Sequence, residues 1–152
     1  MTDKVCVVVG GGKGMGAAIA REMKKRKYTL SLMSPSENCE LLANELEGIA
    51  YRGRAENSSD TDNLIKFTME KFGRIDSLLI HVGGPPKGDL LEISEDDWRK
   101  ANEMVLMPVI RLSKLITPIM QSQGGGSIVN ITTFSVFELS LIHISEPTRP
   151  LT

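Results

Sequence analysis

The chain has 152 residues, a length that fits one domain with a hydrophobic core. Its 18 lysine and arginine residues nearly balance 19 aspartate and glutamate residues, so the charge gives no reason to expect a nucleic acid or an anionic membrane surface as partner. No apolar run approaches the length of a membrane span, no signal sequence precedes the first strand, and the two cysteines make no disulfide framework. We therefore expect a cytoplasmic protein whose partner is a small molecule, with no membrane contact and no metal site.

The clearest functional pattern lies in residues 5–20. A run of strand-forming apolar residues at 5–9 leads into close-set glycines, and small residues at 17–20 begin a helix. A phosphate reaches the free N–H groups at a helix N-terminus only where no Cβ intervenes, so glycines in this context indicate a dinucleotide site. The predicted cofactor-binding residues of this turn are Gly10, Gly12, Lys13, Gly14, Met15 and Gly16.

The second predicted strand, residues 28–33, ends at Ser34. In a dinucleotide fold this strand end faces the adenine ribose, and a carboxylate there would bind the 2′-hydroxyl of NAD. Ser34 offers no carboxylate to repel a 2′-phosphate, and Lys13 supplies a positive charge in the glycine turn. The two residues favour NADP as cofactor, with NAD still possible.

The later elements continue the alternation of strands and helices. Helices are predicted at 37–47, at 57–72 and from Ser94 onward, the last of them kinked by Pro108, and strands at 49–52, 75–82 and 127–132. Five strands alternating with helices predict an α/β fold, a Rossmann-like, doubly wound parallel sheet. Ligands of such sheets lie at the carboxyl ends of the strands.

Four features would share that edge: the glycine turn at 10–16, Ser34, Gly83 and Thr133. His81 falls inside the predicted strand 75–82, and we interpret it as a hydrogen-bonded core histidine rather than a catalytic one. The basic run 24–27 ends the first helix, where cations complement the helix dipole, so we interpret it as a solvated face.

Residues 3–138 resemble the short-chain dehydrogenase/reductase family. The resemblance rests on the glycine turn, on F-G-R-I-D at 72–76, on D-W at 97–98 and on G-G-S-I-V-N-I-T-T at 125–133. It implies an oxidoreductase that transfers hydride between a nicotinamide and a carbonyl or secondary alcohol. Within this family, a basic residue at the position of Lys13 accompanies NADP preference, and pairing through the long helix makes homo-oligomers.

Three departures from the family's pattern bear on catalysis. The family's N-N-A-G after the fourth strand is replaced by Ile80-His81-Val82-Gly83, and its structural asparagine aligns with Val105. The family's catalytic serine aligns with Thr133, whose hydroxyl can still hydrogen-bond a substrate carbonyl. No tyrosine or lysine follows Thr133, so the family's Tyr-x-x-x-Lys pair is missing and we expect this chain to be inactive.

The last residues of the chain differ in character. From Leu139 the sequence reads L-S-L-I-H-I-S-E-P-T-R, which resembles the translation of an adapter used in transposon-based sequencing libraries. We therefore expect residues 1–138 to be an NAD(P)-binding Rossmann domain truncated after its fifth strand, and residues 139–152 to be a non-native tail. Loss of the later elements would leave an apolar face uncovered and make the chain poorly soluble.

A second interpretation stays open. The replaced asparagines and Val105 would also suit a non-catalytic nucleotide-binding or regulatory module. The native continuation of the gene distinguishes the two interpretations, since only an enzyme needs Tyr-x-x-x-Lys.

Overall fold

The computed structural model describes residues 4–84, 88 and 91–132. Strands and helices alternate along these residues as the sequence predicts. The elements are β1 (Val5–Val9), α1 (Gly14–Lys25), β2 (Thr29–Ser34), α2 (Asn38–Glu45), β3 (Ile49–Arg52), α3 (Ser58–Phe72), β4 (Ser77–Ile80), α4 (Glu95–Ser122) and β5 (Ser127–Asn130).

All five strands form one parallel sheet in the order β3-β2-β1-β4-β5. Val9 pairs with Met33 on one side and with Ile80 on the other, and Ile80 pairs with Asn130. The register brings the carboxyl ends of the strands to one edge. The chain reverses its direction of winding between β1 and β4, which makes their carboxyl ends the switch point where such folds bind ligands. The predicted Rossmann-like fold is confirmed.

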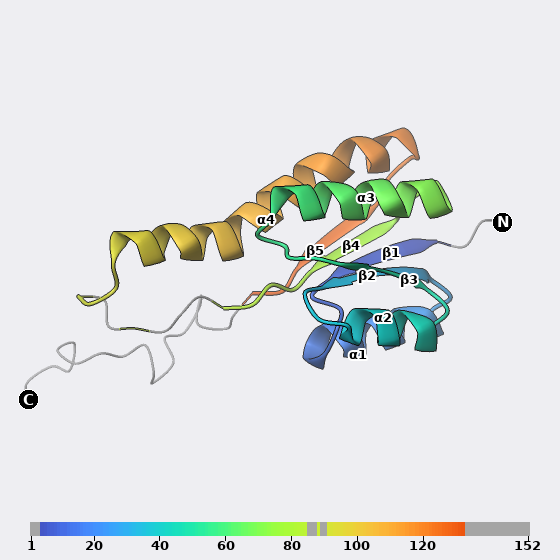
Figure 1. The fold of residues 1–152 in the computed structure, drawn as a ribbon. Helices are drawn as coiled ribbons and strands as arrows, with labels where there is room; N and C mark the ends of the chain where they lie inside the picture. The colour runs from blue at the N-terminus through green and yellow to red at the C-terminus, as the bar shows by residue number, and fades with distance from the viewer. Residues whose placement is uncertain (1–3, 85–87, 89–90, 133–152) are drawn as a thin grey trace, which may run out of the picture.

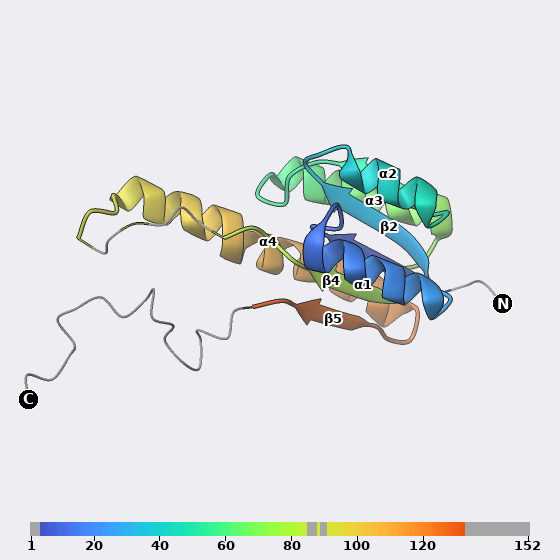
Figure 2. The same ribbon diagram turned by 90° about the horizontal axis from the view of Figure 1, so that it is seen from below.

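The helices cover the two faces of the sheet in pairs (Figures 1 and 2). Helices α1 and α2 pack on one face, around Val8 and Leu32, and α3 and α4 pack on the other, around Val7 and Ile80. Successive side chains of β1 point to opposite faces of the sheet, and all five residues of the strand are buried. Both faces are covered by helices, which explains why this strand is apolar without alternation. Cys6 belongs to the first of these cores, and burial raises the pKa of its thiol to about 12, so it behaves as a small apolar side chain.

The predicted helix boundaries are borne out by their caps. The Asn57 side chain accepts a hydrogen bond from the Ser59 amide at 3.1 Å and starts α3, and Gly73 ends it in the left-handed conformation with φ of 70°. The Ser94 hydroxyl accepts from the Asp97 amide at 3.2 Å and starts α4. At both N-termini a local side chain accepts from a helix-terminal amide, and at the end of α3 the Gly73 amide donates to the Met69 carbonyl at 2.8 Å. Because these contacts are local, the sequence alone locates these ends.

Helix α4 is unusually long and contains Pro108 and Pro118. Figure 1 shows a change of direction midway along it, in agreement with the predicted kink at Pro108. Its first half projects beyond the sheet and exposes apolar side chains, while Leu112 and Ile116 in the second half are fully buried. Helix α4 therefore combines a core segment with an apolar surface.

The edge strand β5 is the least covered strand of the sheet. Val129 pairs with Leu79 and is 50% exposed, whereas Leu79 is 8% exposed. An apolar side chain is thus open to solvent beside the face that α1 and α2 cover, as expected from the sequence. Among the helices of residues 4–84 and 91–132, none combines the length and the hydropathy that a membrane span requires.

The Asp76 side chain links β1 to the turn before β4 by hydrogen bonds. Its carboxylate accepts hydrogen bonds from the Val5 amide at 2.8 Å and from the Arg74 guanidinium at 2.6 and 2.9 Å. The hydrogen bond from Arg74, reinforced by that from the Val5 amide, holds the pKa of Asp76 below its ordinary value, against a smaller opposing effect of burial.

Replacing Asp76 with asparagine is expected to lower the free energy of unfolding by about 1–3 kcal/mol at pH 7, because charge-assisted hydrogen bonds are lost. A carboxyl with a depressed folded pKa stabilises above its unfolded pKa of about 4, and this contribution disappears as the pH falls through the folded value. Urea denaturation of both proteins between pH 3 and pH 7 measures the difference. A difference that stays constant down to pH 3 would contradict this role of the charge.

Candidate nucleotide-binding site

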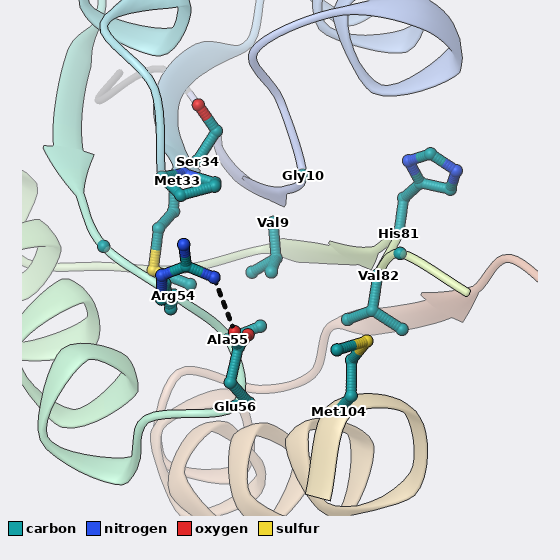
Figure 3. A pocket seen from close by; sticks show the side chains of 13 residues that line it. Val9, Gly10, Met33, Ser34, Arg54, Ala55, Glu56, His81, Val82 and Met104 are labelled. Atoms are coloured by element: carbon teal, nitrogen blue, oxygen red, sulfur yellow. Dashed lines mark hydrogen bonds and ion pairs between the residues drawn. The ribbon is translucent and has the colours of Figure 1, made fainter. Parts of the chain in front are cut away.

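A cavity of about 200 Å³ opens at the carboxyl ends of β1 and β4, at the switch point of the sheet (Figure 3). Residues that follow β1, β2, β3 and β4 contribute to its wall, with one residue from α4. The lining comprises Val9, Gly10, Met33, Ser34, Pro35, Gly53, Arg54, Ala55, Glu56, His81, Val82, Gly83 and Met104. Its position is the one where open parallel sheets bind nucleotides.

Two glycines of the turn, Gly10 and Gly16, leave no room for a side chain. The amides of Gly10 and Gly11 both donate to the Met33 carbonyl, at 2.8 and 3.0 Å, which holds the turn against the end of β2. Gly10 has φ of +79°, and a Cβ on it would collide with the His81 carbonyl oxygen. A Cβ on Gly16 would collide with the Gly10 carbonyl oxygen, so glycine is required at both positions.

Helix α1 begins directly after this turn, at Gly14. Its first amides, those of Gly14, Met15 and Gly16, precede the first intrahelical hydrogen bond, which Ala17 donates to the Lys13 carbonyl. The first turn of α1 carries no acidic residue. Uncommitted amides at the positive end of a helix are suited to a phosphate.

Ser34 lies between the glycine turn and the cavity. Its side chain is almost completely buried, its hydroxyl donates to the Ser36 carbonyl at 3.0 Å, and a Cβ on Gly12 would come within 2.5 Å of its oxygen. The structure therefore brings Ser34 to Gly10 and Gly12, as predicted, and its small size allows this close approach.

Lys13 lies apart from the Ser34 cavity. It is exposed, and it lines a neighbouring groove between α1 and α2, which also includes Gly12, Gly14 and Asn38. Gly12 contacts both regions, since its Cβ position is 3.4 Å from the Cβ of Asn38 as well as close to Ser34. Lys13 therefore lies outside the cavity, on the α1 side of Gly12.

On the opposite wall, Gly83 lines the cavity as predicted, with open space where its Cβ would be. Thr133, the predicted carbonyl-orienting residue, lies outside the described residues.

His81 is placed differently from the sequence interpretation. Strand β4 ends at Ile80, so His81 follows the strand, is only partly buried and lines the cavity. Its amide donates to the Val9 carbonyl at 3.0 Å, and its Nδ1 is 3.3 Å from the Cβ position of Gly10. The interpretation as a core histidine is wrong, because the strand is shorter than its apolar run.

Sequence reasoning missed the wall that follows β3. Arg54 and Glu56 line the cavity from this segment and form an ion pair of 3.0 Å (Figure 3). Their position could have indicated this, since Arg54 and Glu56 follow β3 closely and residues at the carboxyl ends of parallel strands share one edge of the sheet. Met104 of α4 was also missed, and it reaches the cavity only through tertiary packing.

The family model described as short chain dehydrogenase matches residues 4–139. The chain belongs to the short-chain dehydrogenase family. Its Rossmann-like sheet, glycine turn and switch-point cavity are those of an oxidoreductase family, and members bind NAD or NADP.

Two curated members show the extent of the similarity. The chain is 30% identical over 140 residues to a 3-oxoacyl-(acyl-carrier-protein) reductase of Synechocystis sp., covering 88% of this chain and 57% of that one. It is 32% identical over 142 residues to a 7alpha-hydroxysteroid dehydrogenase of Bacteroides fragilis, covering 88% and 55%. The chain spans about half the length of these relatives.

Solved short-chain dehydrogenases share the fold. A 7 alpha-hydroxysteroid dehydrogenase in complex with NADH and 7-oxo glycochenodeoxycholic acid superimposes with a TM-score of 0.84 at 24% identity, over 90% of this chain and 56% of that one. A short-chain dehydrogenase from Streptomyces avermitilis gives a TM-score of 0.82 at 25% identity, over 89% and 51%.

Proposed function

We propose that this chain binds NADP(H) at the switch-point cavity, and that the protein in which it functions transfers hydride between the nicotinamide and a carbonyl or secondary alcohol. The observation that carries the proposal is the glycine turn, in which Gly10 lies so close to the His81 carbonyl, and Gly16 so close to the Gly10 carbonyl, that a side chain is excluded at both positions. It leaves the first amides of α1 directed at the place where a dinucleotide's phosphates would bind.

The preference for NADP is supported by charge. Ser34 supplies a hydroxyl where NAD-specific folds place a carboxylate, and Lys13 and Arg54 carry positive charges on two sides of this position. A 2′-phosphate would therefore meet attraction from Lys13 and from Arg54, the latter reduced by the ion pair of Arg54 with Glu56, and Ser34 adds no negative charge.

The roles in hydride transfer follow from family membership. The nicotinamide supplies or accepts the hydride, and we propose that the Thr133 hydroxyl orients the substrate carbonyl by a hydrogen bond. No tyrosine or lysine follows Thr133 in this sequence, so the chain on its own is expected to bind cofactor without turnover.

Replacing Lys13 with glutamate is expected to weaken NADPH binding about tenfold and NADH binding less than about threefold, because a charge attraction becomes a repulsion only for the 2′-phosphate. Fluorescence titration of both nucleotides against the 152-residue chain measures the two dissociation constants. The matched control is Lys25→Glu, which makes the same charge change at the other end of α1. Equal losses for NADPH and NADH would contradict the assignment of Lys13 to the 2′-phosphate.

A non-catalytic nucleotide-binding module is the second candidate function, favoured by Ile80 and His81 in place of the family's asparagines and by Val105. We propose in addition that residues 139–152 do not belong to the family domain, a proposal that rests on their resemblance to an adapter translation. Sequencing the gene through the codons for residues 137–139, without a transposon adapter, tests both. A frame that continues into Tyr-x-x-x-Lys supports the enzyme, and a genuine stop codon after residue 152 supports the module.

Two wider proposals concern the complete protein. Helix α4 exposes Trp98, Val105, Leu106 and Ile110, which favours pairing of two copies along this helix. A single particle of monomer mass for the complete protein in light scattering would contradict it. The two free, buried cysteines agree with a cytoplasmic location.

A further inference from the structure

The segment after β3 forms one wall of the cavity, and it is held in place by several hydrogen bonds. The Gly53 amide donates to the Ser34 carbonyl at 3.1 Å, and the Arg54 amide donates to the Asp60 carboxylate at 2.8 Å. The Arg54 guanidinium in turn donates to the Glu56 carboxylate at 3.0 Å. Figure 3 shows this pair on the side of the cavity opposite His81.

Arg111 connects the wall segment 53–56 to α4 by hydrogen bonds. Its Nη1 donates to the Glu56 carbonyl oxygen at 2.9 Å, and its Nη2 donates to the Glu103 carboxylate at 2.6 Å. One guanidinium thus joins the cavity wall to a helix 55 residues away in the sequence. The Arg111 side chain is 24% exposed and that of Glu103 is 54% exposed, so the connection runs from the cavity to the surface of α4.

We propose that Arg111 is a positioning residue for nucleotide binding, which fixes Glu56 and thereby holds the Arg54 guanidinium in the cavity. The proposal rests on the proposed function, since it concerns binding of an adenine dinucleotide at the same cavity. Arg54 presents N–H donors and a positive charge there, and a dinucleotide offers both phosphate oxygens and acceptor nitrogens to such a group.

Arg111 can position Glu56 because a guanidinium carries N–H donors on two separate nitrogens. A guanidinium can hold a carbonyl and a carboxylate at once in fixed directions, which neither methionine nor lysine reproduces. Without Arg111 the Glu56 carbonyl loses its partner from α4, and the Gly53–Glu56 segment gains freedom that nucleotide binding must then remove. The Arg54 guanidinium is the group whose placement suffers, because its ion-pair partner is Glu56.

A double-mutant cycle tests this dependence. NADPH and NADH are titrated against the 152-residue chain, against Arg54→Met, against Arg111→Met and against the double variant. We expect Arg54→Met to weaken NADPH binding about tenfold and Arg111→Met to weaken it about threefold to fivefold. In the Arg54→Met background, Arg111→Met should have no further effect, which a merely structural role would not produce. Arg99→Met is the matched control, since it removes an α4 guanidinium that holds two groups at once, the Glu95 and Asp96 carboxylates, at the exposed end of the helix.

Each other outcome overturns the proposal in a distinguishable way. Losses that multiply in the double variant, or an Arg111→Met protein with unchanged affinity, contradict the inference and leave the proposed function intact. A parent chain that binds neither nucleotide contradicts the proposed function and the inference with it.

If Arg111→Met does not fold, Glu103→Gln takes its place in the cycle, because it weakens the anchor of Arg111 and keeps the bond to Glu56. It should then weaken NADPH binding only while Arg54 is present. The same loss in the Arg54→Met background would overturn the proposal.

Discussion

Replacing Gly10 with alanine is expected to abolish nucleotide binding and to lower the free energy of unfolding by about 2–4 kcal/mol. The new Cβ would collide with the His81 carbonyl oxygen, and the residue would have to keep φ at +79°. Relief of the collision requires β1 and the end of β4 to move apart, which opens the turn that holds the amides of α1. Urea denaturation measures the stability, and titration with NADPH measures the binding.

Gly73→Ala separates the two causes of this effect. Gly73 has φ of +70° but open space at its Cβ position, so its replacement brings backbone strain of about 1–2 kcal/mol without a collision. It lies at the end of α3, away from the cavity, and NADPH binding should be unchanged. A Gly10→Ala protein that binds NADPH as well as Gly73→Ala does would show that the tight turn is not required.

Replacing Leu112 with alanine is expected to lower the free energy of unfolding by about 2–5 kcal/mol, because it leaves a cavity under α4. Leu112 is 0% exposed and packs with Leu64 and Ile80 in the core between α3, α4 and the sheet. Thermal and urea denaturation of the variant measure the loss.

The same helix supplies the matched control, Leu106→Ala. Leu106 is 50% exposed, so this variant should change the stability of the monomeric chain by less than about 1 kcal/mol. Equal losses for the two variants would contradict the division of α4 into a buried half and a surface half.

The order and type of all nine elements could be predicted from the sequence, because each signal is local. The apolar run at 5–9, the caps Asn57 and Ser94 and the terminator Gly73 act through neighbouring residues. Strand β4 was predicted four residues too long, since apolar residues continue past the point where pairing stops. Ile75, for example, is fully buried yet lies outside the strand, where the Gln123 side chain satisfies its backbone.

The candidate site could be predicted only where it follows a single motif. The glycine turn, Ser34 and Gly83 meet at one edge of the sheet, as the topology requires. Arg54 was missed although it directly follows a strand, and Arg111 could not have been found, because its contact with Glu56 depends on how α4 packs against α3. Assignment of the named residues to cofactor binding stays a prediction.

The most direct test of the proposed nucleotide site is a titration of the purified 152-residue chain with NADPH and with NADH. The change in nicotinamide fluorescence reports the binding. We expect saturable binding of both nucleotides, with NADPH bound at least about tenfold more tightly because only it carries the 2′-phosphate. Tighter binding of NADH would contradict the NADP assignment. Absence of binding by a cooperatively folded chain would contradict the site itself.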